Sequence, residues 1–135
     1  MSRRKRRVVA VVGSSSFPLT VSVGAAVLDL LLAYPQGTLF LTRGSPGFDT
    51  FLLDACPRLG LPIEVRPSAG GRDNWLRDAA MAVECQELLA FLDPRTLPDE
   101  NTGTSHLVSK FLDKKRRVQA FSAAGDALVF VGSAD

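Results

Sequence analysis

The chain has 135 residues, of which 46% are hydrophobic and 22% are charged, and its formal net charge is +2. This length and composition are typical of one globular domain and exclude an intrinsically disordered chain. The two cysteines, Cys56 and Cys85, and the single histidine lack the spacing of a metal site. We therefore expect no metal or cofactor, and two buried thiols in a reducing compartment.

Positive charge is concentrated in two short runs. Four of the basic residues form Lys114–Arg117, and five more lie near the N-terminus, namely Arg3, Arg4, Lys5, Arg6 and Arg7. The rest of the chain is acidic, so charge does not steer the whole protein toward nucleic acid. We expect residues 1–7 to be a solvated basic arm, with contact to nucleic acid or to a protein surface as the alternative. The domain itself is expected to span residues 8–135.

The N-terminal region resembles the start of a signal peptide, because the basic arm precedes the apolar run Val8–Val12. That run is short, however, and it stops at Gly13 with no typical cleavage region after it. No apolar run approaches the roughly 20 residues that a membrane-spanning helix needs. We therefore expect a cytoplasmic protein with no membrane contact.

Apolar segments and amphipathic segments alternate along the chain. Val8–Val12 is continuously apolar and β-branched, which predicts a central parallel strand. The apolar residues of Val21–Tyr34 recur at helical spacing, which predicts the helix after it. The other predicted elements are a strand at 38–42, a helix at 49–59, a strand at 61–66, a helix at 73–87, a strand at 88–92, a helix at 102–115, a strand at 118–121 and an edge strand at 127–131. This alternation predicts an α/β fold with a single Rossmann-like, doubly wound and mainly parallel sheet and about four helices.

Two of the predicted loops after strands contain glycine and serine. Such loops lie at the edge where open α/β sheets bind ligands. In the first loop, the hydroxyl groups that follow Gly13 can donate to a phosphate or form a turn. In the second loop, glycines allow close approach of the backbone, and Asp49 either caps the next helix or binds a ribose hydroxyl. The candidate ligand-binding residues of these loops are Gly13, Ser14, Ser15, Gly44, Ser45, Gly47 and Asp49.

A third loop opens the predicted helix at 102–115. Gly103 stands there among hydroxyl residues, including Thr104 and Ser105. Backbone N–H groups at such a helix start form an anion-binding nest in outline, although the spacing is not that of a P-loop. His106 follows, with no Ser/His/Asp or Cys/His set around it, so we expect no catalytic triad.

A dense polar cluster with the only tryptophan opens the predicted helix at 73–87. Its members are Arg72, Asp73, Asn74, Trp75 and Arg77. The forked donors of arginine suit phosphate, and an indole ring can stack on a base. The alternative interpretation is a helix start with exposed charges and a half-buried tryptophan.

Four motifs together resemble a known family. They are G-S-S-S-F at Gly13–Phe17, T-R-G-S-P-G-F-D at Thr42–Asp49, R-D-N-W-L-R-D-A-A-M at Arg72–Met81 and T-G-T-S-H-L-V at Thr102–Val108. In this order they resemble the SLOG superfamily, a Rossmann-like group with the LOG phosphoribohydrolases, the DprA proteins and small stand-alone members of bacteria and phages. The resemblance covers about residues 8–121. The positions that match the family's motifs are Gly13, Ser14, Gly44, Gly47, Asp49, Asn74, Met81, Gly103 and Thr104, with either Arg72 or Arg77 as the arginine.

The resemblance implies that the chain binds a nucleotide or nucleotide-derived ligand, as a sensor or binding module. LOG enzymes carry a catalytic glutamate after their G-T loop, but here Ser105, His106 and Leu107 follow Thr104. Whether the chain is an enzyme is therefore left open, and its catalytic residues are unknown.

Two alternatives to simple ligand binding remain. One is a LOG-like nucleotide N-glycosidic hydrolase, whose acid would come from Asp49, Asp73, Asp78 or Glu100. The other is a scaffold that contacts nucleic acid or protein through the basic arm. The predicted edge strand at 127–131 favours a homodimer or larger assembly in any of these cases.

Overall fold

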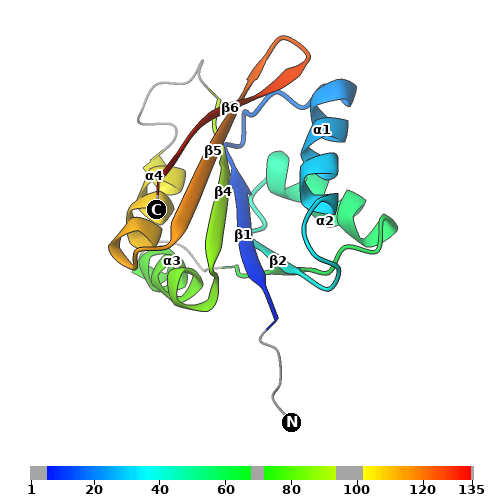
Figure 1. Cartoon of the computed structure of the whole chain (residues 1–135). Helices are drawn as coiled ribbons and strands as arrows, with labels where there is room; N and C mark the ends of the chain where they lie inside the picture. The colour runs from blue at the N-terminus through cyan, green and yellow to red at the C-terminus, as the bar shows by residue number, and fades with distance from the viewer. Residues whose placement is uncertain (1–5, 68–71, 94–101, 135) are drawn as a thin grey trace.

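The computed structural model describes residues 6–67, 72–93 and 102–134, and leaves the side chains of Arg72, Asp73 and residues 102–105 undescribed. Within these ranges, strands and helices alternate as predicted (Figure 1). The elements are β1 (Val8–Gly13), α1 (Val21–Leu32), β2 (Leu39–Thr42), α2 (Phe48–Arg58), β3 (Ile63–Val65), α3 (Arg72–Glu84), β4 (Glu87–Phe91), α4 (Thr102–Asp113), β5 (Arg117–Ala124) and β6 (Ala127–Ala134).

One six-stranded sheet organises the domain, with strand order β3-β2-β1-β4-β5-β6. The first five strands are parallel, and β6 pairs antiparallel with β5. The chain runs outward from β1 to β3 and then returns to place β4 beside β1. This order confirms the predicted doubly wound, mainly parallel sheet. The carboxyl ends of β1 and β4 therefore form a topological switch point, the usual ligand position in such sheets.

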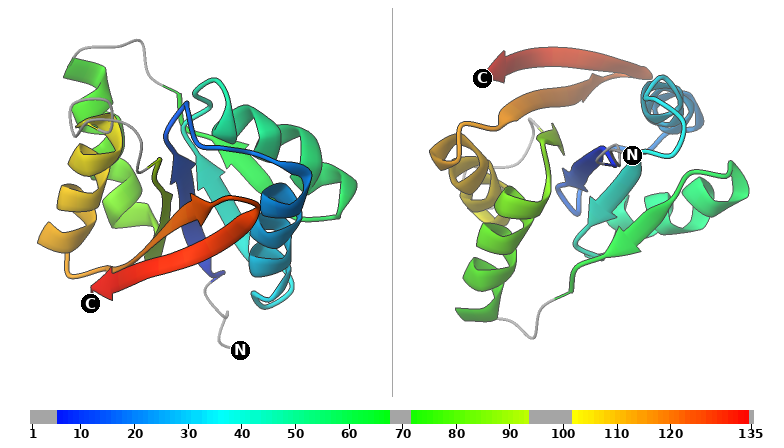
Figure 2. Two further views of the ribbon diagram at one scale, coloured as in Figure 1. Left: turned by 90° about the horizontal axis from the view of Figure 1, so that it is seen from above. Right: turned by 60° about the horizontal axis from the view of Figure 1, so that its bottom comes forward.

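Helices cover both faces of the sheet (Figure 2). α1 and α2 lie on one face, where Val27 and Phe48 pack against Val11 and Leu89. α3 and α4 lie side by side on the other face, where Met81 and Phe111 belong to a second core cluster. Because the sheet is covered on both faces, residues 9–13 of β1 are all buried, which explains the unbroken apolar run in the sequence.

Several element boundaries differ from the predicted ones. α2 begins at Phe48 with Gly47 as its N-cap residue, and Gly47 makes no side-chain cap bond. The prediction that Asp49 caps this helix is therefore wrong. Its carboxylate lies inside the first turn and accepts the N–H of Ser45 instead, with Oδ2 at 3.1 Å. The predicted helix start at Asp73 is late by one residue, since α3 begins at Arg72.

The C-terminal hairpin is longer than predicted, because β5 and β6 pair over nearly their whole length with a bulge between Ala120 and Phe121. β6 forms an edge of the sheet, as predicted, and its apolar residues Val129, Phe130 and Val131 are exposed. The assembly expected from this edge stays a prediction. Among the described residues, no helix is both long enough and apolar enough to cross a bilayer.

Candidate functional site

The loops after β1 and β2 pack directly on each other at the carboxyl edge of the sheet. Gly47 has a φ of 87°, and a Cβ there would collide with the backbone oxygen of Ser15. A Cβ at Gly13 would collide with the ring of Phe48, and one at Gly44 would lie 2.9 Å from Val65 Cγ1. The close approach predicted at these glycines is therefore an approach of the protein to itself, which fixes the shape of this edge.

Asp49 is a fully buried acid beneath these loops. Its Oδ2 accepts the N–H of Ser45, whereas Oδ1 and the buried hydroxyl of Thr42 have no hydrogen-bond partner among the described residues. Burial raises the pKa of the Asp49 carboxyl. The backbone N–H of Ser45, the guanidinium of Arg43, the hydroxyl of Thr42 and the backbone N–H of Gly13 partly oppose that rise. This buried carboxyl group therefore lies among donors at the ends of β1 and β2, although its Oδ1 makes no hydrogen bond of good geometry within the described residues.

Arg43 follows β2 directly and is nearly buried. Burial lowers the pKa of its guanidinium, while the carboxylates of Asp49 and Asp78 raise it. The side chain therefore lies within electrostatic range of an acid from α2 and an acid from α3. We did not predict Arg43 as a site residue, although an arginine directly after a buried parallel strand was a usable signal.

Asp78 and His106 form a pair that joins α3 to α4. Asp78 is 1% exposed, and its Oδ2 lies 2.8 Å from His106 Nδ1. Arg77 Nε donates to the other oxygen of Asp78 at 3.1 Å, and Arg77 Nη2 lies 3.1 Å from the same oxygen in an ion pair. The ring of Trp75 stacks on the imidazole with centroids 5.5 Å apart and an interplanar angle of 22°. Two charged groups and two aromatic rings thus meet in one small cluster.

The structure gives His106 an aspartate partner that the sequence did not indicate. Asp78 lies 28 residues away in sequence, and it reaches His106 because α3 and α4 pack together. The available signal was the position of Asp78 in the buried stripe of α3, three and four residues before Met81 and Ala82. A carboxylate in such a stripe needs a partner, and the pattern does not identify which one.

The remaining predicted site residues divide into three groups. Ser14 is buried, and its N–H donates to the carbonyl oxygen of Phe91 at 2.9 Å, across the switch point. Ser15 and Trp75 are exposed, and Asn74 is half-buried. The structure describes only the backbone of the third group, which comprises Arg72, Gly103, Thr104 and Ser105. The last three of these lie in the first turn of α4. Arg3, Arg4 and Lys5 lie outside the described residues altogether.

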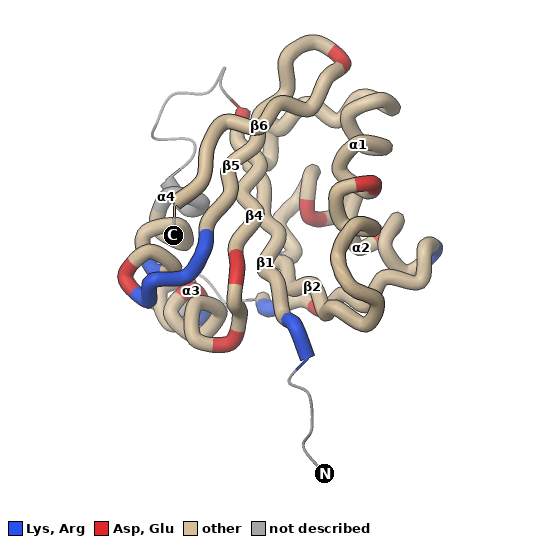
Figure 3. Tube along the Cα trace, viewed as in Figure 1, with Lys and Arg blue, Asp and Glu red and all other residues tan. Residues whose placement is uncertain are grey.

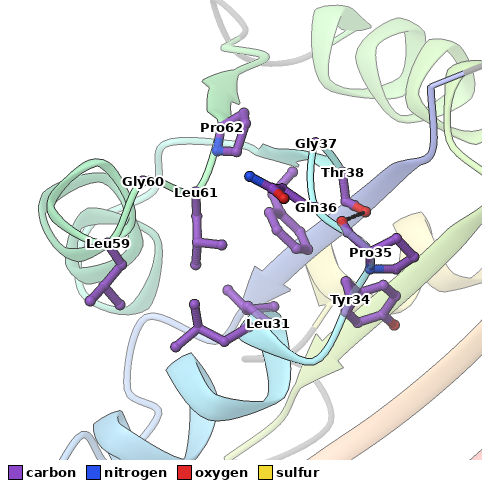
Figure 4. A pocket seen from close by; sticks show the side chains of 12 residues that line it. Leu31, Tyr34, Pro35, Gln36, Gly37, Thr38, Leu59, Gly60, Leu61 and Pro62 are labelled. Carbon is purple, nitrogen blue, oxygen red and sulfur yellow. Dashed lines mark hydrogen bonds between the residues drawn. The ribbon is translucent and has the colours of Figure 1, made fainter.

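The amino edge of the sheet, where the parallel strands begin, carries the described basic residues Arg6, Arg7 and Lys114–Arg117. Figure 3 shows basic residues at the amino end of β1 and along the connection from α4 to β5. Arg7 and Arg117 line one surface pocket there, together with Tyr34 and Glu87. A second pocket at this edge has both apolar and polar lining, and Figure 4 shows Leu31 and Leu61 among the residues around it.

Comparison of the chain with models of known protein families, and with curated proteins, finds no match. The functional conclusion therefore rests on the fold and on the side chains at the carboxyl edge. Those side chains combine charge and burial near the position where doubly wound sheets bind ligands.

Proposed function

We propose that the chain binds a nucleotide or nucleotide-derived ligand at the carboxyl edge of the sheet. The observation that carries the proposal is a cluster of mostly buried charged side chains at the topological switch point. Its members are Arg43, Asp49, Arg77, Asp78 and His106. Buried charges are unfavourable unless they are paired or serve a function, and they concentrate at functional sites.

The chemistry of the cluster supports a ligand with a phosphate and a planar base. Arg77 and Arg43 place two guanidinium groups in the cluster, and such groups bind phosphate oxygens. Arg77 directs Nε and Nη2 toward Asp78, so its charge and its remaining N–H groups would act on a phosphate. Trp75 is 64% exposed and stacks on the ring of His106, so its outer face is available to a base. Membership of the SLOG superfamily, which the sequence motifs imply, is part of the same proposal.

Calorimetric titration tests this function with AMP, ADP, NAD and ADP-ribose, with inorganic phosphate and adenosine as partial ligands. We expect at least one nucleotide to bind, and Arg77→Gln to weaken it by about tenfold or more, because a charge-assisted hydrogen bond contributes about 1.5–3 kcal/mol. Arg58→Gln is the matched control, since Arg58 lies exposed on α2 and pairs only with Asp54 among the described residues. Absence of binding by every nucleotide contradicts the proposal.

A second candidate function is contact with a polyanion such as nucleic acid at the amino edge. The observation that favours it is the shared position of the described basic residues, since Arg6 and Arg7 precede β1, Lys114–Arg116 precede β5 and Arg117 begins it. Parallel strands β1 and β5 begin at the same edge. Binding to a DNA duplex would then weaken steeply as the salt concentration rises. The double variant Lys114→Ala, Lys115→Ala would lower the slope of log affinity against log salt concentration by about 0.9 for each lost phosphate contact. Salt-insensitive binding, or none, contradicts this candidate.

A further inference from the structure

One ring nitrogen of His106, Nδ1, is hydrogen-bonded to the carboxylate of Asp78. Nδ1 lies 2.8 Å from Oδ2 of Asp78, and the other oxygen of Asp78 pairs with Arg77. In that ion pair Asp78 is a carboxylate, which only accepts hydrogen bonds, so Nδ1 must carry the proton. A neutral imidazole holds one ring proton, and Nε2 therefore keeps its lone pair.

Nε2 is the nitrogen that remains available for chemistry. It has no hydrogen-bond partner in the described part of the chain, and the His106 side chain is 26% exposed. Asp78 orients the ring within its plane, and the stacked ring of Trp75 restricts motion out of that plane. His106 is thus a base with a defined direction, and Asp78 and Trp75 are its positioning residues.

The neighbouring cations select the kind of reaction such a base can assist. Arg77 shares Asp78 with His106, and Arg43 lies within electrostatic range of the same carboxylate. Attack of water on phosphorus places negative charge on phosphoryl oxygens, which arginines stabilise. Cleavage of an N-glycosidic bond passes through a cationic sugar, which a carboxylate stabilises. Asp78 is already engaged by His106 and Arg77, so the group left to act in this cluster is the imidazole. The arrangement therefore favours phosphoester chemistry over glycosidic chemistry.

We infer that the site hydrolyses a phosphate ester of a nucleotide, with His106 as the catalytic proton-transfer residue. The inference rests on the proposed nucleotide site and adds a reaction to it. Nε2 removes a proton from water while the water oxygen forms a bond to phosphorus. The bond from phosphorus to the ester oxygen, on the side opposite the attacking water, breaks with its electron pair on that oxygen. The leaving oxygen takes a proton from solvent, and Nε2 returns its proton to solvent. The products are an alcohol and a phosphate, and no electron donor or acceptor is needed.

The proton position can be measured directly, because His106 is the only histidine in the chain. A two-bond ¹H–¹⁵N spectrum of the uniformly labelled protein therefore contains the signals of one imidazole. The spectrum is recorded at a pH well above the ordinary histidine pKa of about 6.5. We expect the Nδ1–H tautomer in the native chain, and a shift toward a mixture of tautomers in Asp78→Asn. An Nε2–H tautomer in the native chain overturns the inference without any assumption about the ligand.

Turnover is tested with the p-nitrophenyl ester of thymidine 5′-monophosphate, by release of nitrophenolate. We expect His106→Gln to lower kcat by about 10²–10⁴-fold, the usual contribution of a proton-transfer residue, with AMP affinity within about twofold of the native value. Asp78→Asn should lower kcat as well and change the tautomer, which a purely structural role would not do. Arg58→Gln is the control with unchanged turnover.

The outcomes separate this inference from the proposed function. Nucleotide binding without turnover of the ester overturns the inference and leaves the binding function standing. Turnover that survives His106→Gln overturns the role of His106. Absence of both nucleotide binding and turnover overturns the binding function and the inference together.

Discussion

Glu87 at the amino edge and Asp49 at the carboxyl edge are both buried carboxylates, but their surroundings differ. The hydroxyl of Tyr34 donates to one oxygen of Glu87 at 2.7 Å. The amide of Gln119 donates to the other oxygen, and Arg117 lies 3.6 Å from it. Of the two Asp49 oxygens, only Oδ2 has a hydrogen-bond partner among the described residues.

This difference separates a structural acid from a candidate functional one. The fold completes the hydrogen bonding of Glu87, as it does for most buried polar groups. At the opposite edge, the hydroxyl of Thr42 and one oxygen of Asp49 make no hydrogen bond of good geometry within the described residues, although Thr42 lies close enough to stabilise the Asp49 carboxylate. Under the proposed function, this edge is where we expect a bound ligand to supply further contacts.

The loop packing at the carboxyl edge gives the largest expected stability effect. Gly47→Ala places a Cβ against the Ser15 backbone at a positive φ, so we expect a loss of unfolding free energy above about 2 kcal/mol. Gly60→Ala is the matched control, because Gly60 has a φ of 72° with nothing within 4 Å. Its loss should be only about 1–2 kcal/mol. Equal losses of unfolding free energy for Gly47→Ala and Gly60→Ala in denaturant titrations would show that the contact between Gly47 and Ser15 does not contribute to stability.

Completion of the Glu87 network is tested by Tyr34→Phe. This change leaves a buried carboxylate oxygen without its donor, so we expect a loss of about 1–3 kcal/mol in unfolding free energy. Nucleotide affinity should stay unchanged, because Tyr34 and Glu87 lie at the edge opposite the proposed site. A weakened nucleotide affinity in this variant would contradict the separation of the two edges.

Asp49→Asn tests the raised pKa of Asp49 through the pH dependence of the unfolding free energy. Burial holds the folded-state pKa of Asp49 above its unfolded value, so its favourable contribution is complete below the unfolded pKa of about 3.9 and is lost as pH rises through the folded pKa. Asparagine can still accept the Ser45 N–H but does not titrate. We therefore expect the variant to gain stability relative to the native chain as pH rises. Asp54→Asn, at an exposed position of the same helix, is the control. A relative stability that falls as pH rises would contradict the raised pKa.

The two thiols give the smallest expected effect. Burial raises the pKa of Cys56 to about 11 and is the main cause of the rise of Cys85 to about 12. Near the ordinary thiol pKa of about 8.5, the thiolate fraction of the native chain is therefore small. We expect Ellman's reagent to react only at the rate of unfolding, and nucleotide to slow it only through global stabilisation. Rapid labelling of the native chain would contradict the closed packing around either residue.

The fold was predictable because its signals are local. The β-branched run at Val8–Val12 reflects a strand that is buried on both of its faces. The helical spacing of apolar residues in Val21–Tyr34 reflects a helix that is buried on one face. Boundaries were less predictable: at α2, the loop geometry at Gly47 set the helix start one residue earlier than the acid at Asp49 indicated.

The candidate site was only partly predictable. The loops at Gly13 and Gly44, and the cluster around Arg77, were recognisable from residue type next to a strand end or helix start. The pairing of Asp78 with His106 was not, because it depends on how two helices pack rather than on spacing along the chain. Arg43 was missed for a similar reason, since its acidic neighbours come from α2 and α3.

Chemical-shift mapping of backbone amides during titration with ADP tests the central claim most directly, because it compares both edges in one experiment. The account predicts the largest shifts at Gly44, Ser45, Arg77 and His106, with Glu87 and Arg117 unchanged. Shifts concentrated at the amino edge, or none at either edge, would contradict it.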